Sequence, residues 1–183
     1  MNKSHFEILR PGVNTTIQDK GRYNLYHIGV SVSGAIDQRN YKLANSLVGN
    51  NLDEAVIEFA YQGPHLKLKN ANINFAITGD ILFKIIRKNS EIEDGECYRN
   101  YLLEEEDQLD IISTKKSAYG YLSVSGGFEL QKLWKSYSTN TKAKIGSNNG
   151  NKFSSDDKIF ITNSEVKNFL EKRIDYKALI DNT

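Results

Sequence analysis

The sequence predicts a mainly β protein with antiparallel strands and one or two short helices. Apolar and polar residues alternate through residues 73–78 and 118–125, which is the period of a half-buried strand. Short apolar groups separated by Gly, Asn or Asp recur along the chain, a spacing typical of a β-barrel or a sandwich. These groups lie at 6–9, 55–59, 66–68, 109–112 and 158–161.

A hairpin is predicted between the two alternating segments. Residues 85–99 contain Glu93, Asp94 and Gly95 in succession, a combination typical of a turn, with strand-forming residues on both sides. We therefore expect antiparallel strands to flank residues 93–95.

The first helix is predicted over residues 38–48. Asp37 can cap its free N–H groups, Ile36 can pack on Tyr41, and Gly49 ends the apolar periodicity.

Residues 1–163 are predicted to form the main folded unit, followed by a helical tail over 164–183. Ser164 is the expected N-cap, and apolar residues follow at helical spacing. This tail either docks on the strands or serves a partner. Residues 136–157 are rich in Asn, Ser, Lys and Gly, which predicts a long mobile loop within the main unit.

Composition argues against several classes of partner. The 183 residues carry 24 Lys and Arg against 23 Asp and Glu, a net charge of +1, so there is no basic excess for nucleic acid or for a membrane surface. Cys97 is the single cysteine, which excludes an internal disulfide and fits a reducing compartment. With no bilayer-length apolar run and no secretory signal, we expect a cytoplasmic protein.

Common catalytic signatures are absent from the sequence. Residues 146–152 fail the P-loop spacing, and Ser33 stands where a nucleophile elbow needs its last glycine. His5, His27 and His65 are far apart in sequence, so no metal site is expected.

Residues 14–37 are the main candidate for a binding site. Gln18, Asp19, Arg22 and His27 supply donors, acceptors and charge among glycines that allow a ligand to approach the backbone closely. The same composition also fits glycine turns between strands with solvated polar side chains.

Several motifs in a fixed order resemble the biotin-dependent carboxyltransferase subunit family, also called allophanate hydrolase subunit 2 or the 5-oxoprolinase C subunit. The resemblance extends over residues 5–162. Its motifs are RPG at 10–12, TTIQDKGR at 15–22, GVSVSGAID at 29–37, LANSLVGN at 43–50, ITGD at 77–80, SVSGGF at 123–128, and Ser138-Thr139.

The resemblance implies a cyclophilin-like antiparallel β-barrel, and members of the family continue into a second, related lobe. It also implies a partner of the allophanate hydrolase subunit 1 type, which corresponds to the B component of 5-oxoprolinase. A lactam-utilisation protein, the A component, is implied as a further partner, together with ATP bound by the complex. Biotin is implied only if the chain serves urea carboxylation.

The resemblance also implies roles for individual residues. Asp19, Arg22 and His27 are the catalytic candidates: Arg22 to bind a carboxylate or phosphate, Asp19 to orient it or move a proton, and His27 to act as acid or base. Asp19 and Arg22 could instead pair with each other, and His27 could be structural. The substrate-binding candidates, including a Gly126-Gly127 backbone cradle for an anion, are Gln18, Gly29, Ser33, Gly34, Thr78, Gly79, Ser125, Gly126, Gly127, Ser138 and Thr139.

Three functions stay open at this point. The first is a subunit of an ATP-dependent 5-oxoprolinase, which opens the lactam 5-oxoproline to L-glutamate, or of a related amide-hydrolysing complex. The second is the carboxyltransferase part of a urea carboxylase and allophanate hydrolase system. The third is a non-catalytic regulator that binds a sister protein resembling a histidine-kinase inhibitor, and a truncated product that depends on dimerisation is a further possibility.

Overall fold

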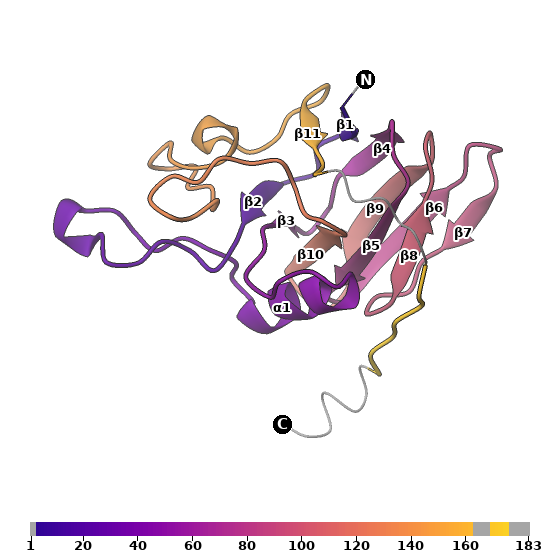
Figure 1. The fold of residues 1–183 in the computed structure, drawn as a ribbon, viewed down its shortest axis with the longest axis horizontal. Helices are drawn as coiled ribbons and strands as arrows, with labels where there is room; N and C mark the ends of the chain where they lie inside the picture. Colours follow the sequence, from indigo (N-terminus) through magenta and orange to yellow (C-terminus); the bar gives the residue numbers. More distant parts are fainter. Residues whose placement is uncertain (1–2, 163–168, 176–183) are drawn as a thin grey trace.

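The computed structural model describes residues 3–162 and 169–175, which form two packed antiparallel sheets and one α-helix (Figure 1). The six-stranded sheet has the order β11 (Lys158–Phe160), β1 (His5–Arg10), β4 (His65–Lys69), β9 (Gln108–Thr114), β6 (Ile81–Ile86) and β7 (Ile92–Asp94). The five-stranded sheet has the order β2 (Thr16–Gln18), β3 (Val56–Ala60), β10 (Tyr119–Val124), β5 (Ile73–Thr78) and β8 (Asn100–Leu103). The mainly β, antiparallel prediction is confirmed.

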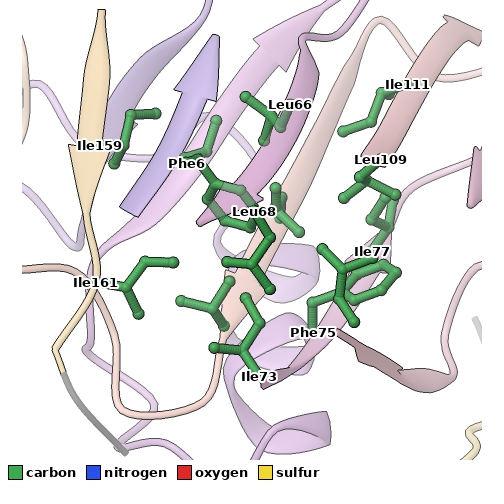
Figure 2. Packing of buried hydrophobic residues seen from close by; sticks show 14 of the residues in the cluster. Phe6, Leu66, Leu68, Ile73, Phe75, Ile77, Leu109, Ile111, Ile159 and Ile161 are labelled. Atoms are coloured by element: carbon green, nitrogen blue, oxygen red, sulfur yellow. The ribbon is translucent and has the colours of Figure 1, made fainter. Parts of the chain in front are cut away.

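The main core lies between the two sheets. Figure 2 shows Phe6, Leu68 and Leu109 of the six-stranded sheet facing Ile73 and Phe75 of the five-stranded sheet. Burying one such side chain contributes about 1.5–3 kcal/mol, so this shared layer holds the sheets together.

Helix α1 (Gln38–Leu47) covers the opposite face of the five-stranded sheet. Its buried Tyr41 and Ala44 pack with Val56 and Tyr121, which explains why β3 and β10 are buried on both faces. The predicted Asp37 cap is present: its side chain accepts the N–H groups of the first turn.

Ile36 is 65% exposed, so the predicted packing of Ile36 on Tyr41 can bury only a small part of its side chain. The backbone N–H of Ile36 donates instead to Glu58 Oε2 at 2.8 Å, and this bond fixes the entry into α1 with the Ile36 side chain outward.

The predicted barrel does not close. A loop lies along β2, where Thr139 N donates to Ile17 O at 2.9 Å, so no further strand continues the ladder from that edge. Elsewhere the sheets meet through an isolated bridge between Phe128 and Ile161. The molecule is therefore a two-sheet sandwich.

The predicted turn at 93–95 is displaced along the chain. Glu93 and Asp94 belong to β7, and the turn between β6 and β7 spans residues 87–91, where Arg87 N donates to Glu91 O at 2.8 Å. Ser90 supplies the positive φ that this turn requires, so glycine is not needed there.

The predicted helix over 164–183 falls largely outside the described residues. Residues 169–175 are described, and they contain no helix: they are irregular apart from an isolated bridge between Arg173 and Arg99. Asn100 N donates to Lys172 O at 3.1 Å and Ile174 N donates to Tyr98 O at 2.9 Å, so pairing beside β8 replaces helical hydrogen bonds in this segment.

Residues 136–157 form a loop with a short 3₁₀ turn at Asn148–Gly150. Ser136, Ser138 and Phe153 within it are buried, so part of the loop is packed against the sheets. Its mobility stays a prediction. Within the part of the chain that the structure describes, no helix has the length and hydropathy to span a membrane.

Candidate functional site

Two long loops come together beyond the β2 edge, and we call them the paired loops: residues 19–37 and 131–153. They lie side by side in Figure 1 as the purple loop after β2 and the orange segment before β11. The sequence separates them by about a hundred residues, yet Asp19 contacts Ser138 and Ser31 contacts Asn140.

Asp19 is the centre of the contact between the paired loops. Its Oδ1 accepts from Gly21 N at 2.7 Å, Ser136 Oγ at 2.7 Å and Ser138 Oγ at 2.5 Å, while Oδ2 accepts from Tyr137 N at 2.7 Å. Asp19 is buried and these donors occupy both of its oxygens. It therefore positions the two loops relative to each other.

Arg22 is buried beside this network without forming an ion pair to Asp19. Its guanidinium donates to Ser138 O and, at 3.3 Å, to Ser33 Oγ, while Nε has no partner in the described residues. Burial lowers the pKa of Arg22, and the nearby Asp19 partly opposes this effect. A buried guanidinium with a donor to spare can take an anion or the carbonyl of a ligand.

A cleft of about 490 Å³ opens on the α1 side of the β2–β3–β10 sheet, under the paired loops. We call it the Glu58 cleft. Its lining includes Gln18, Ser33, Gly34, Glu58, Thr139 and Lys142.

Gln18 offers a free acceptor to this cleft. Its Nε2 donates to Thr16 Oγ1 at 3.0 Å and to Thr139 O at 3.1 Å, which fixes the orientation of the amide. Its Oε1 is buried and has no partner among the residues that the structure describes. A buried acceptor left without a donor is costly, so a ligand N–H would be favourable here.

Glu58 contributes a carboxyl group to the same cleft. Thr16 and Glu58 are cross-strand partners, which places Gln18 diagonally from Glu58 on one face, roughly 7–8 Å away. Burial raises the pKa of Glu58, and the hydrogen bonds from Ile36 N and Tyr121 oppose the rise. A protonated carboxyl group can donate to a ligand oxygen.

A second cleft of about 410 Å³, the Trp134 cleft, is lined by both paired loops. Lys20, Arg22 and Tyr23 contribute from the first loop, and Trp134 and Lys135 from the second. Arg22 thus lines this cleft while its hydrogen-bond partner Ser33 lines the other.

Comparison with known proteins shows which family the chain belongs to. Residues 28–181 match the family model "Carboxyltransferase domain, subdomain A and B". The chain belongs to this carboxyltransferase domain family.

Relatives come from two kinds of enzyme. The chain is 31% identical over 169 residues to urea amidolyase of Saccharomyces cerevisiae, an alignment that covers 90% of this chain and 9% of the relative. It is 30% identical over 160 residues to the C subunit of 5-oxoprolinase of Haemophilus influenzae, covering 87% of this chain and 50% of the relative. The crystal structure of K. lactis urea amidolyase superposes with a TM-score of 0.81 at 29% identity, over 88% of this chain and 10% of that one. The chain thus spans half or less of the length of these relatives.

Not all of the residues that the resemblance suggested reach the clefts of this carboxyltransferase domain. Gln18, Ser33, Gly34 and Thr139 line the Glu58 cleft, Arg22 lines the Trp134 cleft, and Asp19 and Ser138 lie buried between them. His27 lies in an exposed 3₁₀ turn, Tyr26–Ile28, and Gly29 ends this turn. Neither residue lines a described cleft.

The remaining candidates hold the fold on other parts of the sheet. Thr78 Oγ1 donates to Asn40 O at 2.7 Å, Gly79 N donates to Tyr98 Oη, and Ser125 Oγ accepts from Asn74 N. The Gly126-Gly127 cradle is not available for an anion. Gly126 N donates to Asn50 Oδ1 at 2.9 Å and Gly127 N to Val124 O at 3.0 Å.

Sequence reasoning missed Glu58 and the side chains of Trp134, Lys135 and Lys142. Glu58 had a readable signal, since it is the one charged residue in the apolar run 55–60. A lone carboxyl group in a strand buried on both faces has to be partnered or functional. The other three residues, Trp134, Lys135 and Lys142, lie in loops, where no periodicity in the sequence predicts which side chains will line a cleft.

Across residues 3–162 and 169–175, no three His, Cys, Asp or Glu side chains gather in a way that would hold a metal ion. The Cys97 thiol hydrogen-bonds Ile81 O, and burial raises its pKa to about 11, so it is a weak nucleophile.

Proposed function

We propose that this chain is a subunit of an ATP-dependent 5-oxoprolinase, and that the Glu58 cleft holds the lactam while its ring opens to L-glutamate. The observation behind the proposal is the pairing of a free buried acceptor, Gln18 Oε1, with a carboxyl group whose pKa is raised, Glu58, on one face of one cleft. The relatives named as the C subunit of 5-oxoprolinase support the choice of substrate.

A lactam presents its N–H and its C=O on the same side of the ring. Gln18 Oε1 accepts the ring N–H, and protonated Glu58 donates to the carbonyl oxygen. Charge that develops on this oxygen as water attacks the carbonyl carbon is then met by a donor already in place. Lys142 at the cleft provides a cation for the 5-oxoproline carboxylate.

Asp19 and Arg22 act through the loops in this scheme. Asp19 ties residues 136–138 to the end of β2, and Arg22 holds Ser33 and the Ser138 carbonyl at the edge of the cleft. ATP, when bound to the complex, supplies activation of the poorly electrophilic amide. Partners of the B and A types complete the enzyme in this proposal.

A second candidate is the carboxyltransferase part of a urea carboxylase. The similarity to urea amidolyase favours it, and urea offers the same N–H and C=O pair to Gln18 and Glu58. In that case carboxybiotin delivers the carboxyl group to urea.

The test is reconstitution with sister subunits and measurement of ATP-dependent glutamate release from 5-oxoproline. Glu58→Gln is expected to lower kcat by about 100-fold, since loss of one preorganised donor to an oxyanion has this order of effect. Glu129→Gln is the matched control, because Glu129 is exposed and pairs only with Lys3 among described residues.

Full activity of Glu58→Gln would refute the lactam site. Carboxybiotin-dependent carboxylation of urea in the same preparation would select the second candidate. Tight binding to a sister protein that leaves its turnover unchanged would indicate a regulator instead.

A further inference from the structure

The Trp134 cleft takes no part in the proposed lactam binding, yet its lining is unusual for a structural hollow. Two aromatic rings, Trp134 and Tyr23, are about half exposed at its edge, and the cations Lys20, Arg22 and Lys135 line it. A cleft of about 410 Å³ has the size of an ordinary small-ligand site.

The turn that carries Trp134 and Lys135 is strained for these two residues. Leu133 and Ser136 exchange backbone hydrogen bonds, Leu133 N to Ser136 O at 2.9 Å and Ser136 N to Leu133 O at 3.3 Å. The two residues between them have φ of +51° and +65°, the left-handed region that two-residue hairpin turns fill with Asn and Gly.

A left-handed backbone costs an ordinary residue roughly 1–2 kcal/mol. Turn geometry alone would therefore favour glycine at position 135 in place of Lys, and would disfavour Trp at position 134. The sequence keeps both side chains at the cleft despite this cost, which is the pattern expected where side-chain function outweighs backbone preference.

The positive charge of the cleft is only partly compensated. Lys20 pairs with Asp53 at 2.7 Å, but Arg22 and Lys135 form no ion pair with any described residue. Asp19, the nearest carboxylate to Arg22, has both oxygens occupied by donors from its own loops. The Nε of Arg22, a residue that lines this cleft, is buried and has no partner in the described part of the chain.

We infer that the Trp134 cleft binds a nucleoside triphosphate. The base stacks on Trp134 and Tyr23, and the phosphates meet Lys135 and Arg22. Aromatic faces with adjacent guanidinium and ammonium groups are the chemistry that recognises a planar base joined to a polyanion. The inference goes beyond the proposed function because it places the nucleotide on this chain, in a different cleft from the amide.

The experiment uses the fluorescence of Trp134, which is the only tryptophan in the chain. The full-length chain is excited at wavelengths that avoid nucleotide absorption and titrated separately with ATP, adenosine, tripolyphosphate and biotin. Saturable quenching by ATP is expected. Adenosine and tripolyphosphate should bind with at least tenfold lower affinity, because each lacks one half of the recognised ligand. No saturable response to ATP, an equal affinity for tripolyphosphate, or quenching by biotin in place of ATP would overturn the inference.

Lys135→Gly separates binding from folding. Glycine relieves the left-handed strain, so the variant is expected to unfold at the same or a higher urea concentration while its ATP affinity falls about tenfold, as for loss of one charged hydrogen bond. Lys116→Ala is the matched control, because Lys116 is exposed and lines none of the described clefts. Unchanged ATP affinity in Lys135→Gly would refute the site. Glu58→Gln should bind ATP normally, so a failure of this inference and a failure of the lactam site give different results.

Discussion

The sandwich core and the paired loops are both well buried, but different forces hold them. The core is a continuous layer of apolar side chains drawn from both sheets, in which each residue has many neighbours (Figure 2). The paired loops are joined by separate hydrogen bonds, and their centre is one carboxylate, Asp19, which accepts hydrogen bonds from four groups on two segments. The core is therefore redundant, whereas the loops are held by a small number of hydrogen bonds, several of which end on Asp19.

This difference separates stability from function. Both candidate clefts are lined by the paired loops, and the sheets contribute the rigid base on which Gln18 and Glu58 stand. Substitutions in the core should lower the free energy of unfolding without changing the clefts of the molecules that remain folded. Substitutions in the loop network should change the clefts first.

The largest expected effect tests the core side of the comparison. Phe75→Ala removes a fully buried ring that stacks on Tyr101 at 5.6 Å and meets Phe83 edge-on at 6.3 Å between centroids. We expect a loss of about 3–5 kcal/mol in the free energy of unfolding, measured by urea denaturation. Leu82→Ala, at an exposed position of β6, is the control and should change it by less than about 1 kcal/mol. If the folded Phe75→Ala protein no longer binds ATP at the Trp134 cleft, the core and the paired loops are not independent in this way.

The next effect tests the loop side. Asp19→Asn keeps the shape of the side chain but replaces one acceptor oxygen with a donor, which leaves buried N–H or O–H groups of residues 136–138 without a partner. We expect a loss of about 2–3 kcal/mol. Proteolytic cleavage within residues 131–153 should also become faster, while the circular dichroism of the sheets stays native.

Asp53→Asn is the control for that substitution. Asp53 is exposed and pairs with Lys20, so its loss should change the free energy of unfolding by less than about 1 kcal/mol. If Asp19→Asn resists proteolysis as well as Asp53→Asn does, the loops do not depend on the Asp19 acceptor.

The sheets could be predicted from sequence because their signal is local. The alternation at 73–78 is β5, the apolar groups along the chain lie in or overlap β1, β3, β4, β9 and β11, and the Asp37 cap marks the start of α1. Closure into a barrel could not be predicted, since it depends on whether another strand or the 139–153 loop lies along β2. The segment 169–175 has helical spacing in sequence, and backbone hydrogen bonds to Tyr98 and Asn100 replace the helix there.

The candidate site was also predicted only in part, because some of its residues share a local motif whereas others are brought together by long-range contacts. Gln18, Asp19 and Arg22 lie in one motif and could be recognised together, and Ser138 and Thr139 were found through the resemblance. That Asp19 binds Ser136, Tyr137 and Ser138 is a long-range contact that no local pattern encodes. His27 has the right chemistry but sits in an exposed turn, since side-chain type alone does not fix position.

A pair of glycines sharpens the comparison within the loops. Gly146 has φ of +95°, and a Cβ built there would lie 2.0 Å from Ser138 O and 3.0 Å from an Arg22 guanidinium nitrogen. Gly29 has φ of +77°, and nothing lies within 4 Å of its Cβ position. Gly29→Ala should cost about 1 kcal/mol from backbone strain alone. Gly146→Ala should cost about 1–2 kcal/mol more, because it also crowds a packed contact.

The two variants are compared by urea denaturation and by the ATP titration of Trp134 fluorescence. Only Gly146→Ala should weaken the ATP response, because it displaces the carbonyl that orients Arg22. Equal losses in both variants would mean that positive φ, rather than the packing of the loops, limits their stability.

The smallest effect concerns Glu58, the β3 carboxyl group that lines the Glu58 cleft. Burial raises the pKa of Glu58 above the value of about 4.3 that it has in an unfolded chain. At low pH the group is protonated in both states and has no effect. As pH rises through the unfolded pKa, the unfolded state loses its proton first, so the free energy of unfolding falls until the folded pKa is passed. Glu58→Gln removes this contribution. As pH is raised from about 4, the free energy of unfolding of the variant should therefore rise relative to that of the wild type. Urea denaturation of both proteins across the acidic range measures it, and a difference that does not depend on pH would mean that Glu58 titrates normally and cannot serve as the proton donor of the cleft.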